Sequence, residues 1–84
     1  MKYEKTYLVQ NTFTGAQDDL TADEVIDQAQ YWANKLLSNQ QNNSASETAY
    51  YLNQKTLLKD SNVSRLSKIK AAREILEIVN IYVN

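Results

Sequence analysis

The side chains of this sequence that could do chemistry are mainly carboxylates, because histidine and cysteine are both absent. Their absence removes the usual general base, the thiolate nucleophile and two common metal ligands. Five carboxylates gather in the segment DDLTADEVID, residues 18–27, and no lysine or arginine follows them until Lys35. Acid–base catalysis by paired carboxylates needs two of them across a cleft, which one exposed helix does not supply. We therefore expect no enzymatic activity.

Metal and cofactor binding have equally little support in the residue pattern. Oxygen ligands for Mg²⁺ or Ca²⁺ could come from Asp18, Asp19 and Asp23, but the segment lacks the spacing and the glycine of an EF-hand loop. One glycine in the whole chain also excludes a glycine-rich phosphate loop. The sequence predicts neither a metal nor a cofactor.

Part of the acidic segment is explained by the start of a helix. Thr21 and Glu24 have the spacing of a capping box, and Leu20 and Val25 have that of a hydrophobic staple. Acidic residues in a first helical turn also complement the helix dipole, which accounts for Asp23.

Helix initiation leaves two residues of this helix unexplained. Asp27 lies four residues beyond Asp23, which makes a mildly unfavourable like-charge pair. Tyr31 follows at the same spacing and is the one aromatic residue on the polar side of this helix. An exposed tyrosine among carboxylates is typical of a surface that binds a basic protein. We predict a protein-binding site formed by Asp18, Asp19, Asp23, Asp27 and Tyr31.

The elements that must position these residues begin with a strand. Polar and apolar residues alternate over residues 3–13, with one face made of Tyr3, Tyr7, Val9 and Phe13. Gly15, in the stretch TGAQDD, indicates a turn or loop. The strand needs a partner, which could be a second short strand, the C-terminal segment or another chain.

Three amphipathic helices are predicted to follow, at about 22–38, 46–59 and 63–80. Ser44 and Glu47 offer a capping box for the second helix. Its apolar pattern is divided: Leu52 shares one side with small residues, whereas Tyr51 and Leu58 point elsewhere and form either a second buried side or an exposed stripe. Residues 78–84 could be helix or strand, and we favour helix to about residue 80.

These elements predict a single small domain over residues 1–84. Its fold class is α+β, mainly α: an N-terminal strand or hairpin followed by three helices packed as a small bundle. The predicted core contains Trp32, Leu36, Leu52, Ile69, Leu76 and Val79.

A second hypothesis concerns residues 54–75, which resemble the helix-turn-helix segment of repressor-type DNA-binding domains. Asn62 stands where those proteins often have a turn glycine, and the basic 55–73 segment surrounds it. The resemblance implies that Arg65, Lys68 and Lys70 contact DNA near the start of a recognition helix. The order of strand and helices is also similar to that of ribbon-helix-helix repressors, which pair their strands across a dimer.

The sequence therefore favours a non-catalytic protein-binding module, a small regulator or inhibitor in the style of phage or mobile-element proteins, with a basic partner surface. The alternatives are a small DNA-binding regulator and an assembly protein that forms a homo-oligomer through the N-terminal strand or through Tyr51 and Leu58. The net charge of −1 gives no bulk attraction to nucleic acid or membranes. Since no apolar run approaches about 20 residues and the N-terminus has no signal-peptide features, we expect a cytoplasmic protein without a membrane partner.

Overall fold

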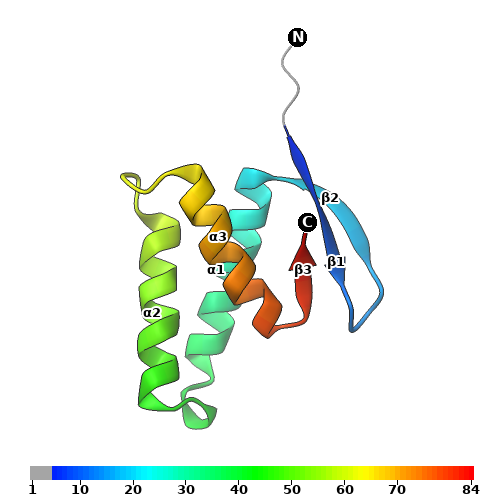
Figure 1. Cartoon of the computed structure of the whole chain (residues 1–84). Helices are drawn as coiled ribbons and strands as arrows, with labels where there is room; N and C mark the ends of the chain where they lie inside the picture. Colours follow the sequence, from blue (N-terminus) through cyan, green and yellow to red (C-terminus); the bar gives the residue numbers. More distant parts are fainter. Residues whose placement is uncertain (1–4) are drawn as a thin grey trace.

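A computed structural model describes residues 5–84 of the chain, apart from the side chain of Gln40. The predicted strand over residues 3–13 begins outside this range, because its first two residues, Tyr3 and Glu4, are not described. The preceding residue, Lys2, is not described either. The elements in chain order are β1 (Thr6–Asn11), β2 (Gln17–Thr21), α1 (Ala22–Ser38), the short 3-10 helix η1 (Gln40–Asn42), α2 (Ala45–Lys59), α3 (Arg65–Ile78) and β3 (Ile81–Val83) (Figure 1). The predicted mainly α domain of the α+β class is confirmed.

The strands form an antiparallel sheet in the order β2-β1-β3, so β1 is paired on both sides within the chain. Val9 of β1 lies opposite Asp18 on β2 and opposite Val83 on β3. Helices α1 and α3 pack on one face of the sheet. Alternate residues of a strand point to opposite faces, and accordingly Val9 is buried under the helices while Leu8 is exposed on the outer face.

The stretch after Gly15 is only partly the loop that the sequence predicted. Gly15 has φ of 80° and its N–H donates to the Asn11 carbonyl at 2.7 Å, as a turn residue does. Residues 17–19, however, belong to β2, so a loop there was the wrong prediction. Pairing with β1 overrides the low strand propensity of aspartate, and it places Asp18 and Asp19 on an edge strand.

Both predicted capping boxes are present. The Thr21 hydroxyl accepts from the Glu24 N–H at 3.3 Å, and the Glu24 carboxylate accepts from the Thr21 N–H at 2.9 Å. Ser44 and Glu47 make the same reciprocal pair at the start of α2. The predicted apolar side of α1 is also confirmed, because Val25, Ile26, Ala29 and Ala33 are its buried residues.

Helix α2 is oriented differently from the prediction. Leu52 is 50% exposed, whereas Tyr51 and Leu58 are 5% and 1% exposed, so Leu52 was wrongly placed in the core. An oligomer interface through Tyr51 and Leu58 is wrong for the same reason. The buried side also contains a polar residue, Gln54, whose amide donates to the Tyr50 hydroxyl at 3.0 Å. This bond satisfies a group that a hydrophobic-periodicity argument assigns to solvent.

The C-terminal prediction also needs correction. Helix α3 begins at Arg65, after the N-cap Ser64, and ends at Ile78. Asn80 has φ of 64°, a left-handed conformation that asparagine tolerates better than most residues, and the chain reverses there. Residues 81–83 then pair with β1 as β3, so the strand alternative holds for them, and the helix ends two residues earlier than we favoured.

The core lies between the sheet and the three helices. Of its predicted members, Ile69 and Leu76 are buried, and Trp32, Leu36 and Val79 are partly buried against it. Among residues 5–84, no helix has the length and apolar character needed to cross a membrane.

Candidate functional site

The five predicted binding residues do not form one patch, because α1 separates them. Asp23 and Asp27 line a groove between the start of α1, the end of α2 and the start of α3, which we call the charged groove. Asp18 and Tyr31 line a second groove between α1 and the sheet, which we call the aromatic groove. Asp19 belongs to neither, since its neighbour Asp18 faces the helices and alternate strand residues point to opposite faces.

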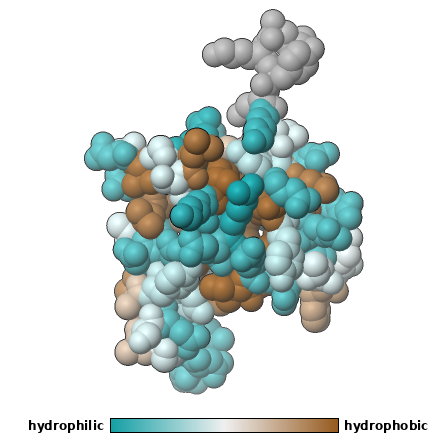
Figure 2. All heavy atoms as spheres, in the orientation of Figure 1, coloured by the Kyte–Doolittle hydropathy of each residue, from teal (hydrophilic) through white to brown (hydrophobic). Residues whose placement is uncertain are grey.

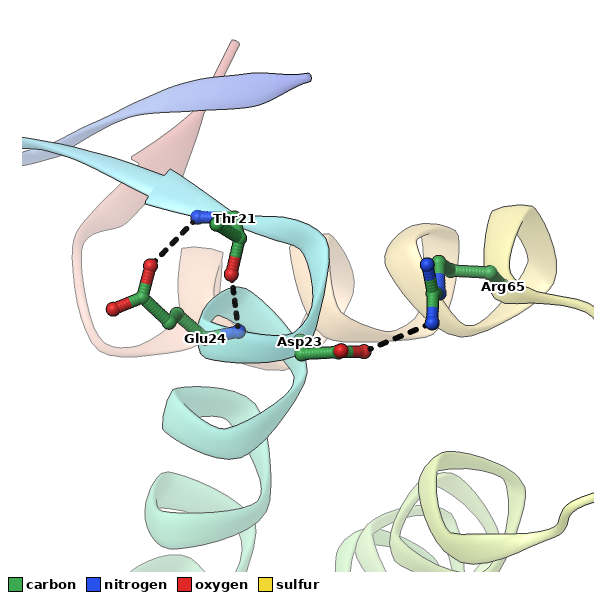
Figure 3. A network of polar contacts seen from close by, with 4 residues as sticks. All are labelled: Thr21, Asp23, Glu24 and Arg65. Atoms are coloured by element: carbon green, nitrogen blue, oxygen red, sulfur yellow. Dashed lines mark hydrogen bonds and ion pairs between the residues drawn. The ribbon is translucent and has the colours of Figure 1, made fainter. Parts of the chain in front are cut away.

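In the charged groove, the two carboxylates lie among basic side chains. Lys59, Arg65 and Lys68 line it together with Asp23 and Asp27. Arg65 Nη2 lies 3.4 Å from Asp23 Oδ1, and both side chains are nearly two-thirds exposed (Figure 3). An ion pair this exposed contributes only about 0–1 kcal/mol to stability. The pair nevertheless means that Asp23 does not offer a free negative charge to a partner, and Asp27 shares the groove with three basic residues.

The same groove weakens the case for a recognition helix. Arg65 and Lys68 share it with two carboxylates, which would repel an approaching phosphate. Lys70 lies apart from it on the exposed side of α3. The paired position of β1 also excludes a shared ribbon built from residues 6–11, which ribbon-helix-helix dimers require.

The aromatic groove is an open depression of about 330 Å³, smaller than the charged groove at about 650 Å³. The rings of Tyr31 and Trp32 meet edge to face there, with centroids 5.3 Å apart. Its lining residues are Val9, Asn11, Ala16, Asp18, Gln28, Tyr31, Trp32 and Ile81. Small-molecule sites in proteins span about 300–1,000 Å³. This groove is at the lower limit, which suits one amino-acid side chain better than a nucleotide.

Three polar groups of the aromatic groove are uncommitted within residues 5–84. Asp18 has no cationic side chain within ion-pair distance there, and neither the Gln28 amide nor the Tyr31 hydroxyl makes a hydrogen bond. Asn11 differs, because its side-chain oxygen accepts from the N–H groups of Phe13 and Thr14 and so holds the β1–β2 turn. Lys35 Nζ lies 5.5 Å from the centroid of the Tyr31 ring but does not line the groove. Among residues 5–84, Asp18 is therefore the one acidic or basic residue in its lining.

The remaining polar network involves α2 and α3. The Tyr50 hydroxyl donates to Glu74 at 3.1 Å and accepts from Gln54. Burial raises the pKa of Tyr50 above its ordinary value of 10.0, and the neighbouring Glu74 carboxylate adds to this rise. These groups hold two helices together and border neither groove.

Sequence reasoning missed Gln28 and Trp32 as site residues. Trp32 was assigned to the core, although it is only partly buried and also lines the groove. Asp18, Asp19 and Asp23, the trio weighed for metal binding, are divided between the two sheet faces and the charged groove. Within residues 5–84, no three carboxylates are grouped closely enough to hold a metal ion. Comparison with protein-family models, curated proteins and solved structures finds no significant match.

Proposed function

We propose that this protein is a non-catalytic binding module that captures a basic side chain of a partner protein in the aromatic groove. The observation that carries the proposal is that Asp18, Gln28 and Tyr31, whose polar groups are uncommitted within residues 5–84, line one groove together with Trp32. By occupying a basic residue of its partner, the protein would act as a small regulator or inhibitor. The cysteine-free composition suits a reducing cytoplasm.

The groove fits both parts of a lysine or arginine side chain, the aliphatic stem and the charged end. The aliphatic stem of the guest would lie against Val9, Ile81 and Trp32, as long basic side chains lie along apolar surfaces. Its charged end would reach Asp18, and the Gln28 carbonyl and the Tyr31 hydroxyl would accept further hydrogen bonds. Since Lys35 already lies near the Tyr31 ring, we assign the charge recognition to Asp18 rather than to that ring.

The partner's basic character follows from the charge around the groove. No lysine or arginine occurs between Lys5 and Lys35, a span that includes β1, β2 and most of α1. An anionic guest would meet Asp18, and none of the lysine or arginine residues within residues 5–84 lies in the lining. The aromatic groove thus replaces the wider acidic patch that the sequence suggested, and it retains Asp18 and Tyr31 from it.

Trp32 allows the proposal to be tested with a small-molecule probe, because it is the only tryptophan of the chain. The probe is N-acetyl-arginine methylamide, and its uncharged counterpart is N-acetyl-norleucine methylamide. We expect the arginine probe to change Trp32 fluorescence with a Kd of roughly 0.1–10 mM, a range set by the size of the ligand. Asp18→Asn should weaken this binding about fivefold or more.

Glu77→Gln is the matched control, since it removes one exposed acid from α3, away from both grooves. It should leave the response to the probe unchanged. A norleucine response as strong as that of arginine would contradict the proposal, and so would an Asp18→Asn variant that binds normally.

A further inference from the structure

Strand β2 forms one edge of the sheet, and no strand within the described residues 5–84 pairs with its outer side, which we call the free edge. The Asn11 N–H donates to the Ala16 carbonyl at 2.9 Å, and hydrogen-bonded pairs alternate along an antiparallel ladder. The pairs Val9–Asp18 and Tyr7–Leu20 therefore point their backbone groups at each other. The N–H and C=O groups of Gln17 and Asp19 consequently point away from β1, towards the free edge.

The pairing on the other side of β1 supports this assignment. The Asn84 N–H donates to the Leu8 carbonyl at 2.9 Å, and the Thr12 N–H donates to the Asn80 carbonyl at 3.0 Å. The backbone N–H and C=O groups of the even-numbered residues of β1 thus point towards β3, and those of the odd-numbered residues point towards β2. At the end of β2, the Thr21 N–H is already taken by Glu24, so the free edge is centred on Gln17 and Asp19.

Two consecutive acids on this edge point to opposite faces of the sheet. Asp18 lies on the helix side, in the aromatic groove, and Asp19 lies on the outer side, opposite Leu8. An added strand would run about 4.8 Å from β2 and would place its own consecutive side chains on the same two faces. Directly opposite residues of neighbouring strands have Cβ atoms about 4.5–5.5 Å apart, close enough for ion pairing by long side chains.

We propose that the free edge of β2 receives an extended dibasic segment of the partner as a fourth strand. One base of the segment enters the aromatic groove beside Asp18, and the next base pairs with Asp19 on the outer face. This inference rests on the proposed function and specifies the form of the partner: two consecutive basic residues in an extended stretch of chain. Backbone hydrogen bonds supply affinity in such strand additions, and the side-chain pockets supply specificity.

The opposite edge of the sheet lacks the features that select this guest. Strand β3 has three residues, Ile81–Val83, none of them charged. The two carboxylates of β2 would disfavour pairing with an apolar or acidic strand and favour pairing with a basic one, since like charges directly opposite each other are unfavourable. Charge complementarity therefore assigns the segment to β2.

The test uses the peptide Ac-Thr-Val-Arg-Lys-Val-Thr-NH2 and two versions of it. One version is methylated at the backbone amide nitrogen of the arginine, and the other at the backbone amide nitrogen of the lysine. In an added strand, one of these nitrogens points at β2 and the other points at solvent. We expect one methylated peptide to bind about tenfold or more weakly and the other to bind like the parent. Amide hydrogen exchange of Gln17 and Asp19 should slow when the parent peptide binds. Asp18→Asn and Asp19→Asn should each weaken binding about two- to fivefold, while Glu77→Gln should not.

The outcomes separate this inference from the proposed function. If the peptide changes Trp32 fluorescence but both methylated versions bind alike and the Gln17 and Asp19 amides stay unprotected, strand addition is overturned and the groove function stands. If the peptide does not bind while the arginine probe does, strand addition is again overturned alone. If neither binds, both proposals fail.

Discussion

Replacing Leu58 with alanine should destabilise the protein far more than replacing Leu52. Leu58 is 1% exposed and is among the largest fully buried side chains, whereas Leu52 is 50% exposed on the same helix. A buried leucine truncated to alanine costs about 2–5 kcal/mol, because transfer energy is lost and a cavity remains. A domain of 84 residues has a free energy of unfolding of about 4–13 kcal/mol, so this loss is a large fraction of the total. Leu52→Ala should cost less than about 1 kcal/mol.

Urea unfolding followed by far-ultraviolet circular dichroism measures both variants on the same scale. Leu52→Ala is the matched control, since it removes the same atoms from the other side of α2. Equal losses, or a larger loss for Leu52→Ala, would refute the orientation of α2. The charged groove would then be misplaced as well, because Leu58 lies in its lining.

Three further predictions concern local interactions. Thr21→Ala removes the hydroxyl that caps α1 and should cost about 0.5–2 kcal/mol in urea unfolding, an effect that Thr21→Ser should largely avoid. A double-mutant cycle with Asp23→Asn and Arg65→Gln should give a coupling energy of about 0–1 kcal/mol that shrinks at 1 M salt, and a coupling above 2 kcal/mol would show that this pair is not exposed. Because the pKa of Tyr50 is raised, its contribution to stability is complete below about pH 10 and is lost as the pH rises further. The drop in stability between pH 9 and pH 11 should therefore be smaller in Tyr50→Phe, and an identical drop would contradict this role.

Local signals predicted the elements well where a few neighbouring residues determine the structure. The capping boxes of Thr21 and Ser44 fixed both helix starts, and the turn at Gly15 was placed correctly. Failures occurred where tertiary contacts decide. Periodicity cannot choose between the two sides of α2, because the choice depends on which side packs against α1 and α3, and the Tyr50–Glu74 hydrogen bond to α3 spans 24 residues of the chain. The end of α3 depends on Asn80 and on an open edge of β1 that is 70 residues away in the chain.

The candidate site was predictable only in its residue types. Asp18 and Tyr31 were correctly suspected of proximity, but the sequence grouped them with Asp23 and Asp27 on one surface. Their separation follows from the register of β2 on β1 and from the direction in which α1 leaves the sheet. Neither is encoded within a short window of sequence. The partners of the acids are equally non-local, since Arg65 lies 42 residues beyond Asp23.

The assembly alternative loses both of its predicted interfaces in this structure. Residues 6–11 are paired on both sides, and Tyr51 and Leu58 are buried. In the view of Figure 2, the apolar atoms of the described residues form separate small patches among polar side chains. A stable interface between copies usually needs a larger continuous apolar surface than this one face of the molecule presents.

The binding of a basic side chain in the aromatic groove is tested most directly by intermolecular nuclear Overhauser effects. N-acetyl-arginine methylamide is titrated into the protein, and contacts from its side-chain methylene protons are assigned. We expect contacts with the ring protons of Trp32 and Tyr31, and contacts about fivefold or more weaker in Asp18→Asn at the same probe concentration, chosen below the Kd. Contacts with the charged groove around Lys59 and Val63, or contacts with Trp32 that are equally strong in Asp18→Asn, would contradict this binding mode.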